Sequence, residues 1–184
     1  MSLVQAFSMM EQLKNYFFNK AVETAKQSLT SAKKAKKQLL CVMEVAELEA
    51  SQYIEKTNTH FKNAGYEIYF LFYWSKLNEK MDGTNVHFYS KKKVSWFGGL
   101  TNLSEYDCLL ISYDLVLYPQ KSFRKDFEFV SKIIDSNLQV GTVENLEKYN
   151  LDLALDCDSS DLTSFYKQLN DYFPRLFSRK IASN

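Results

Sequence analysis

The chain of 184 residues is long enough for one domain, or for one domain with a helical extension. Hydrophobic residues make up 46% of it and charged residues 24%, with 12 tyrosines and 14 phenylalanines for a packed core, which excludes a largely disordered protein. The formal net charge of +1 excludes a protein that coats nucleic acid by charge alone.

The cysteines and the apolar runs indicate where in the cell the protein is located. Cys41, Cys108 and Cys157 are odd in number and far apart, which is typical of free thiols in a reducing environment. No secretory leader opens the sequence, and apolar runs such as YFLFYW at 69–74 are much shorter than the roughly 20 residues of a membrane helix. These features predict a soluble, cytoplasmic protein with no membrane span.

Residues 1–64 contain neither glycine nor proline and are rich in good helix formers. A first apolar stripe follows Ala6, Met10, Leu13, Phe17 and Ala21 at helical spacing. SLTSAKK at 28–34 offers hydroxyl side chains that could cap a second helix. We expect two long helices folded back as a hairpin, with one unbroken rod as the alternative.

The second half of this segment carries a sharper apolar seam. Its members are spaced by three and four residues, or lie on the same side of a helix: Leu39, Met43, Ala46, Ala50, Tyr53 and Phe61. An apolar seam of this kind buries itself against the other helix of the hairpin or against a second chain. The sequence therefore predicts an interaction seam, with self-association as the preferred form.

After Gly65 the pattern changes to that of strands. YEIYFLFYW at 66–74 predicts a buried strand, and an Asp-Gly turn in MDGTN at 81–85 predicts a hairpin with a second strand that begins at Asn85. Further strands are expected over 106–119 and 151–156. Helices are expected over 120–135 and over 159–173, where Pro174 bends or ends the second one.

These elements predict an α+β, or mixed α/β, fold. A long N-terminal helical hairpin over 1–64 precedes an α/β domain over 65–184, with a mixed sheet of four or five strands and two or three flanking helices.

Patterns for catalysis or cofactor binding do not emerge from the sequence. The five glycines form neither a dinucleotide nor a P-loop pattern, and the three cysteines and two histidines lack zinc-ligand spacing, so we expect no cofactor and no metal. Asp107 and Asp114 flank the strand expected over 106–119 and could serve a metal-dependent nuclease. No Asp-x-Lys or Glu-x-Lys accompanies them, and we expect no catalytic residues.

Two basic stretches are candidate contacts for an anion or nucleic acid. KKAKK at 33–37 forms one positive face of a helix, and YSKKKVSWFGG at 89–99 combines lysines with an aromatic side chain that could stack on a base. The alternative interpretation is a solvated helix face and an edge strand protected by lysine. The candidate residues are Lys33, Lys34, Lys36, Lys37, Lys91, Lys93 and Trp96.

The sequence as a whole favours a non-enzymatic macromolecular-interaction protein: an adaptor, inhibitor, immunity-type or assembly component that acts through protein–protein contacts. Its partner would be another protein or a second copy of the chain. The alternative is a protein that binds or processes nucleic acid through the lysine clusters and the carboxylates around the expected central strand.

Overall fold

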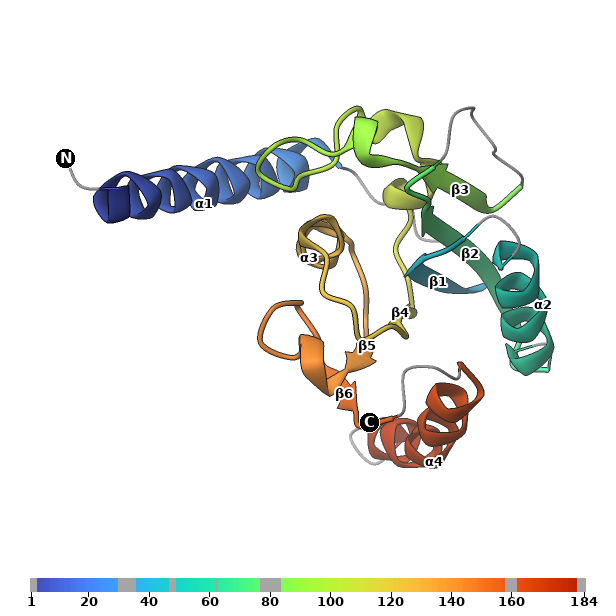
Figure 1. Cartoon of the computed structure of the whole chain (residues 1–184). Coiled ribbons are helices and arrows are strands. Elements are labelled where there is room, and N and C mark those ends of the chain that lie inside the picture. The colour runs from blue at the N-terminus through green and yellow to red at the C-terminus, as the bar shows by residue number, and fades with distance from the viewer. Residues whose placement is uncertain are drawn as a thin grey trace.

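Continuous apolar runs become strands that are buried on both faces, as in other parallel sheets. The computed structural model describes residues 3–29, 36–46, 49–61, 63–76, 84–157 and 162–181. In these ranges six strands form one sheet: β1 Lys37–Glu44, β2 Tyr66–Tyr73, β3 Val86–Tyr89, β4 Leu115–Tyr118, β5 Gln139–Thr142 and β6 Leu153–Leu155. All adjacent strands are parallel, in the order β3-β2-β1-β4-β5-β6 (Figure 1).

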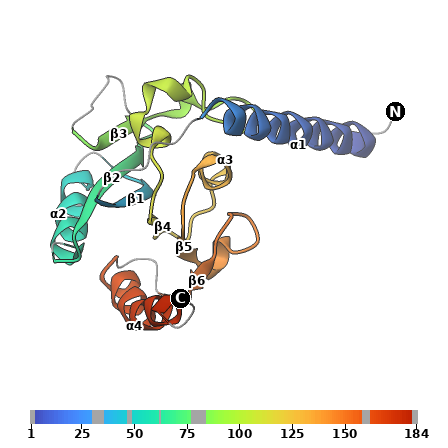
Figure 2. The ribbon, with the colours of Figure 1, turned by 180° about the vertical axis from the view of Figure 1, so that it is seen from behind.

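Helices cover both faces of this sheet (Figures 1 and 2). They are α1 Leu3–Ser28, α2 Ala50–Phe61, α3 Lys125–Ile133 and α4 Leu162–Ile181. Side chains of β1 alternate between two cores, with Leu40 and Val42 facing α1 and α3, and Leu39, Cys41 and Met43 facing α2 and α4. The fold is therefore a three-layer α/β arrangement with a parallel sheet in the middle layer.

The chain winds outward from the centre of the sheet in two directions. From β1 it passes through α2 to β2, and from β4 it passes through α3 to β5. Because these steps run toward opposite edges, α2 and α3 lie on opposite faces. Between β3 and β4 the chain forms three short 3-10 turns, at Lys91–Lys93, Leu103–Glu105 and Asp107–Leu110, and a fourth, Val143–Asn145, follows β5.

The second half of α1 holds the residues of this helix that are buried on the body of the protein. Phe18, Val22 and Ala25 are buried there, and the Phe18 ring meets Phe129 of α3 edge-on at 5.9 Å between centroids. The first half projects beyond the sheet, as both views show (Figures 1 and 2). The first half of α1 is therefore exposed to solvent.

The prediction of a helical hairpin over 1–64 and a mixed sheet is wrong. α1 is a long helix, but the segment that was expected to continue as its partner contains β1, which pairs with β2 and β4 at the centre of the sheet. Leu39 and Met43 therefore lie in a strand. The good helix formers in KQLLCVME adopt a strand because their apolar side chains are buried on both faces, which outweighs their intrinsic propensity.

The expected hairpin is also wrong, since β2 and β3 are parallel. The Asp-Gly pair of MDGTN lies outside the described residues. The strand over 66–74 is confirmed by β2, but β5 was not foreseen, and the stretch 106–119 yields only the short β4 after a 3-10 turn. α4 continues past Pro174 to Ile181, so this proline does not end the helix.

Candidate functional site

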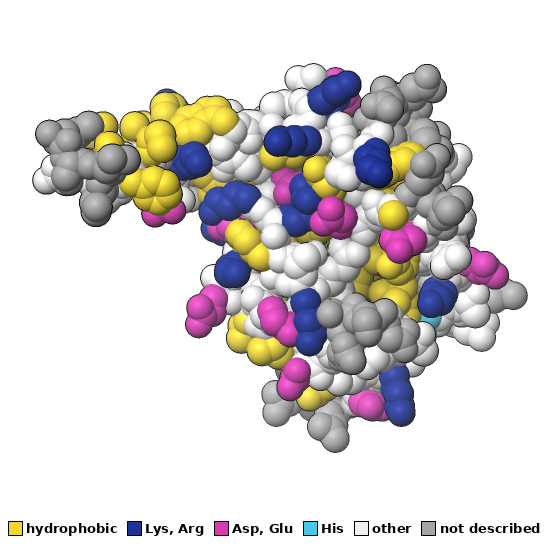
Figure 3. All heavy atoms as spheres, in the orientation of Figure 1, with side chains coloured by type: hydrophobic (Ala, Val, Ile, Leu, Met, Phe, Trp, Pro, Cys, Tyr) yellow, Lys and Arg dark blue, Asp and Glu magenta, His cyan; other side chains and the backbone are white. Residues whose placement is uncertain are grey.

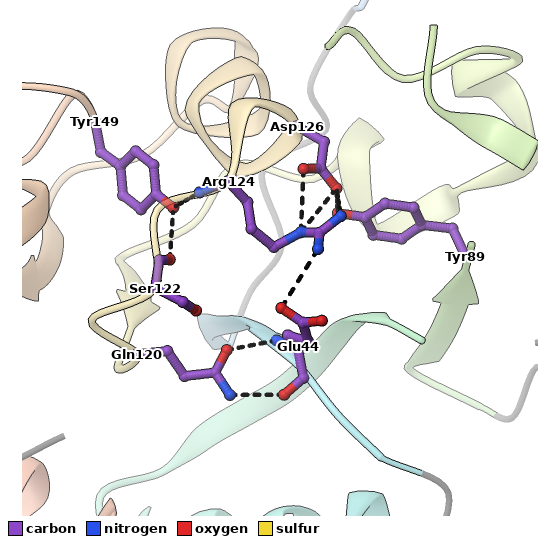
Figure 4. Close-up of polar contacts among 7 residues, drawn as sticks. All are labelled: Glu44, Tyr89, Gln120, Ser122, Arg124, Asp126 and Tyr149. Atoms are coloured by element: carbon purple, nitrogen blue, oxygen red, sulfur yellow. Dashed lines mark hydrogen bonds and ion pairs between the residues drawn. The ribbon is translucent and has the colours of Figure 1, made fainter. Parts of the chain in front are cut away.

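The winding of the chain reverses between β1 and β4. In parallel α/β sheets of this kind, ligands bind at the carboxyl ends of the strands where the winding reverses. Here that position is occupied by polar residues from three segments: Glu44 at the end of β1, Gln120 just after β4, and Arg124 at the start of α3 (Figure 4). We call these residues, with Asp126 and Tyr89, the switch-point cluster.

Gln120 ties the two central strands together. Its Oε1 accepts a 2.6 Å hydrogen bond from the Glu44 backbone N–H, and its Nε2 donates a 2.6 Å bond to the Glu44 carbonyl oxygen (Figure 4). The side-chain amide thus behaves as an extra peptide unit that extends the β1–β4 ladder. The carbonyl oxygen of Gln120 accepts a bond of 2.8 Å from Nδ2 of Asn145, which follows β5.

Arg124 is the residue on which the cluster converges. Its guanidinium stacks on the Tyr73 ring, with Cζ 3.2 Å from the ring centroid. It donates to both carboxylate oxygens of Asp126 at 3.1 to 3.3 Å, and its NH1 lies 3.3 Å from Oε2 of Glu44. Burial alone would lower the pKa of Arg124, but the charge and hydrogen bonds of Asp126 outweigh it and raise the pKa above its ordinary value.

Two tyrosines complete the surroundings of this arginine. The Tyr89 hydroxyl donates to Oδ2 of Asp126 at 2.7 Å, and burial, followed by the nearby Asp126 carboxylate, raises the pKa of Tyr89. The Tyr149 hydroxyl accepts the Arg124 backbone N–H at 3.0 Å. Both phenols therefore stay protonated at neutral pH and act as hydrogen-bonding partners that hold the start of α3 against the sheet.

A cavity of about 690 Å³ opens beside the cluster. This volume lies within the range of small-molecule sites, roughly 300–1,000 Å³. Its lining comes from the ends of β1, β2 and β4 and from the start of α2: Glu44, Val45, Ala46, Glu49, Trp74, Ser75, Lys76, Gln120 and Ser122. Several of its polar groups already have partners, because Gln120 binds Glu44, and Oε2 of Glu49 accepts the Ala46 N–H at 3.2 Å. These contacts favour a structural role for the cluster.

The basic candidates from the sequence do not form one surface. Lys33 and Lys34 lie outside the described residues. Lys36 and Lys37 are exposed at the amino edge of the sheet, whereas the turn Lys91–Lys93 follows β3 at the carboxyl edge. Within that turn Lys93 is engaged, because its Nζ lies 2.6 Å from Oε2 of Glu105. The full length of the strands therefore separates the two groups of lysines.

The residues of the expected interaction seam are divided between β1 and α2. Leu39 and Met43 are fully buried in the sheet, and Ala46 is exposed in the following loop. Ala50 and Phe61 are buried on the inner face of α2, where Tyr53 is half-buried against the same core. Except for Ala46, these side chains pack inside the protein.

The strongest exposed feature is an apolar surface on the projecting half of α1. In Figure 3 hydrophobic side chains gather along the projecting part of the helix. Phe7 is 63% exposed and Trp96, from the loop beside α1, is 61% exposed. We define the α1 apolar surface by the large side chains that are at least two-fifths exposed here: Phe7, Met9, Met10, Leu13, Tyr16, Phe17 and Trp96.

An aromatic contact joins this surface to the body of the protein. The Phe17 ring lies 5.7 Å from the Trp96 ring and 6.4 Å from the Phe97 ring, between centroids. Next to it, Gly98 has φ of +96° and lies against the Lys125 side chain, so the loop packs closely on the start of α3. Trp96 is therefore presented beside the projecting half of α1.

Metal and thiol chemistry find little support among the described residues. Within them, no group of three or more His, Cys, Asp or Glu side chains could hold a metal ion. Asp114 lies at the amino edge, where its carboxylate accepts hydrogen bonds from the Gln38 backbone N–H at 2.9 Å and from the Asn137 side-chain amide at 3.2 Å. All three cysteines are buried thiols outside any disulfide, and burial raises the pKa of the Cys41 thiol to about 12.

Sequence reasoning missed the switch-point cluster and the exposed half of α1 for different reasons. Arg124, Glu44 and Tyr89 are distant in sequence, and only the polar residues that directly follow apolar strands hinted at a shared edge. The stripe Ala6, Met10, Leu13 and Phe17 was recognised, but it was expected to be covered by a second helix. In the structure the place of that second helix is taken by β1.

Comparisons with known proteins identify a family without a known activity. No curated protein and no solved structure matches the chain. Among the described residues, no helix is long and apolar enough to cross a membrane. A family model described as "Family of unknown function (DUF6913)" matches residues 11–176, which include the whole sheet, Leu13, Tyr16, Phe17 and Trp96. The chain therefore belongs to this family of unknown function, DUF6913.

Proposed function

We propose that this protein is a non-enzymatic interaction protein and that the α1 apolar surface is its contact surface for another protein. The observation that carries the proposal is the exposure of six large apolar side chains on one projecting helix, with Trp96 of the neighbouring loop beside them. A large aromatic side chain has roughly 200 Å² of surface. At about half exposure, the seven side chains present on the order of 700 Å² of apolar surface.

This area is larger than that of apolar side chains scattered singly over a protein surface. The largest apolar patch on a typical monomer is about 300–600 Å², and each partner of a standard protein interface contributes about 800 Å². The α1 apolar surface lies near the second figure. It is also rich in Phe, Tyr, Trp and Met, the residue types that are enriched in protein interfaces. Its size and composition therefore both fit a protein partner.

The switch-point cluster supports a binding role over a catalytic one. A catalytic group needs free polar atoms that can reach a substrate. Here the Gln120 amide is bonded at both of its ends, and Arg124 is surrounded by Asp126, Glu44 and Tyr73. These residues stabilise the junction of β1, β4 and α3, which in turn holds the domain from which α1 projects.

The test places a photo-reactive amino acid at Met9, on the α1 apolar surface, in the cell where the protein normally occurs. We expect irradiation to produce covalent adducts with protein at one or a few discrete masses. The same substitution at Asp171, which is exposed on α4, is the matched helical control and should give no such adduct.

A second variant tests whether the adducts depend on the α1 apolar surface. Leu13→Glu places a charge in its middle, so it should abolish the adducts formed from position 9. Adducts with nucleic acid or lipid alone would contradict a protein-binding role, as would protein adducts that Leu13→Glu leaves unchanged.

A further inference from the structure

The α1 apolar surface contains a seam with the spacing of a coiled coil. Ala6, Met10, Leu13 and Phe17 follow one another at intervals of four, three and four residues. At about 100° per residue, this seam lies on a different face of α1 from Phe18, the first residue buried against the body of the protein. One helix thus presents two apolar faces, and the seam lies on the exposed one.

We infer that this seam pairs with the same seam of a second copy of the chain, with the two α1 helices antiparallel. The inference rests on the proposed function, and it names the partner. The two-fold axis would pass between Met10 and Leu13 of each copy. Closed two-fold pairing is the commonest form of association among identical chains, and it needs a surface that is complementary to itself.

The seam has this self-complementarity. When two such helices run antiparallel about the axis, Met10 lies opposite Leu13 of the second copy. On either side of that central pair, Phe17 lies opposite Ala6. A large side chain therefore meets a small one at both ends of the seam, which is the arrangement that lets facing helices interdigitate.

The shape of the protein leaves room for this pairing. The projecting part, from residue 3 to residue 17, is about 22 Å long at 1.5 Å per residue. It extends clear of the sheet in both ribbon views (Figures 1 and 2). With the axis between Met10 and Leu13, the body of the second copy lies beyond the free end of α1. Trp96, beside Phe17, would then cover the start of the partner's helix.

A lipid surface fits this helix less well than a second copy does. Interfacial helices carry a strongly basic polar face beside a single apolar one. In α1, Glu11 and Glu23 are interspersed with three lysines, and the large exposed side chains extend over an arc of about 180°. Pairing with an identical helix buries the seam in the middle of this arc and needs no excess of positive charge.

The first test is sedimentation of the purified full chain with two single variants. We expect the wild type to sediment at twice the chain mass of 21.5 kDa, and Leu13→Glu to sediment at the mass of one chain. Gln12→Glu introduces the same charge on the neighbouring residue, outside the seam, and should remain a dimer. Circular dichroism and urea unfolding will show whether Leu13→Glu is folded.

The second test determines the direction of the helices through disulfide formation. The three native cysteines are buried and do not compete. In the antiparallel pair, a mixture of separately tagged Ala6→Cys and Phe17→Cys chains should form mixed disulfides, because these positions face each other. Phe17→Cys chains alone should not, since the two copies of position 17 would lie about 16 Å apart along the helices at 1.5 Å per residue, whereas a parallel pair would join position 17 to itself. Rapid disulfide formation by Phe17→Cys alone would therefore overturn the antiparallel arrangement.

The remaining outcomes separate this inference from the proposed function. A wild-type chain that stays monomeric at all concentrations, but still gives photo-adducts with other proteins from position 9, overturns self-pairing and leaves the proposed function intact. A monomer that floats with phospholipid vesicles, and loses this behaviour in Leu13→Glu, overturns both in favour of a lipid surface.

Discussion

Arg124 shows how a single charged side chain can connect distant parts of the chain. It contacts the end of β1 through Glu44, the end of β2 through Tyr73, and the first turn of its own helix through Asp126. Its side chain is 19% exposed and that of Asp126 only 4%. The pair is therefore partly removed from water. In such an environment a charged group that has lost its partner destabilises the folded protein.

We expect Arg124→Met to lower the free energy of unfolding by about 3–5 kcal/mol. The methionine side chain can still pack on Tyr73, but it leaves the buried Asp126 carboxylate with no cation beside it. Equilibrium unfolding in urea, followed by far-UV circular dichroism, measures the loss.

The double variant Arg124→Met, Asp126→Asn is the control for this prediction. It removes the buried negative charge together with its partner, while the introduced amide oxygen can still accept the Tyr89 hydroxyl bond. We expect it to be more stable than Arg124→Met alone. Equal losses of stability in the two variants would mean that the unpaired charge of Asp126 is not what destabilises Arg124→Met.

At this scale the sequence allowed only part of the site to be predicted. Trp96 was singled out as a candidate contact, and it lies at the edge of the α1 apolar surface. The lysines with which it was grouped lie apart from one another, because a run of like charges in sequence does not determine a common surface. Arg124 could not be identified, since its partners are brought to it by the order of the strands.

Among the elements, α1 combines two different environments in one helix. Its second half is held by burial of Phe18, Val22 and Ala25, and the Lys125 ammonium lies 4.1 Å from the Phe18 ring centroid. Its first half exposes large apolar side chains to solvent. Substitutions in the two halves should therefore have different effects on the stability of the fold.

We expect Phe18→Ala to reduce the free energy of unfolding by about 3–5 kcal/mol, because it removes a buried aromatic ring and leaves a cavity. Leu13→Ala should change it by less than about 0.5 kcal/mol when the chain is dilute enough to be a monomer. Urea unfolding of both variants at low protein concentration compares them. A large loss for Leu13→Ala under these conditions would show that the first half of α1 packs on its own body.

The elements that sequence patterns predicted well are those whose patterns have one interpretation. β2 is aromatic and bounded by Gly65. The segment 120–135, whose apolar residues have helical spacing, contains α3. β1 was misassigned because Leu39, Met43, Ala46 and Ala50 also satisfy a helical period. The competing signal was the unbroken apolar run LLCVM, which is typical of a central parallel strand.

Across the whole molecule, α2 and α4 join on one face of the sheet through Tyr166. Its ring stacks on His60 at 4.6 Å between centroids, and its hydroxyl lies 2.6 Å from Oγ1 of Thr57. Burial lowers the pKa of His60 from its ordinary value of 6.5, and a hydrogen bond with Asn170 opposes this shift in part. His60 is thus neutral in the folded protein at neutral pH.

This shift predicts that stability falls as the solution is acidified. Above the unfolded pKa of 6.5 His60 is neutral in both states, whereas below it the unfolded chain takes up a proton more readily than the folded one. We expect the wild type to lose more stability than His60→Phe between about pH 7.5 and about pH 5. Urea unfolding at several pH values tests this, and parallel curves for the two proteins would contradict it.

The arrangement of the sheet was beyond sequence reasoning for a physical reason. Strand order depends on which crossovers turn toward which edge, and this depends on how helices pack on a completed sheet. β3 and β5 are only four residues long, and Gly141 in β5 weakens its pattern further. In the fold a Cβ atom there would approach Cδ1 of Leu151 to 2.8 Å, so a larger residue at this position would require the Leu151 side chain to move.

The pairing of β1 with β4 has a consequence for how the chain is made. Leu39 leaves the ribosome long before its neighbour Leu115, so synthesis proceeds through many residues while one side of the central strand has no hydrogen-bonding partner. During that interval β2 and β3 can complete the other side. The nascent protein must therefore keep a strongly apolar strand from pairing with a neighbouring chain until β4, Leu115–Tyr118, has emerged.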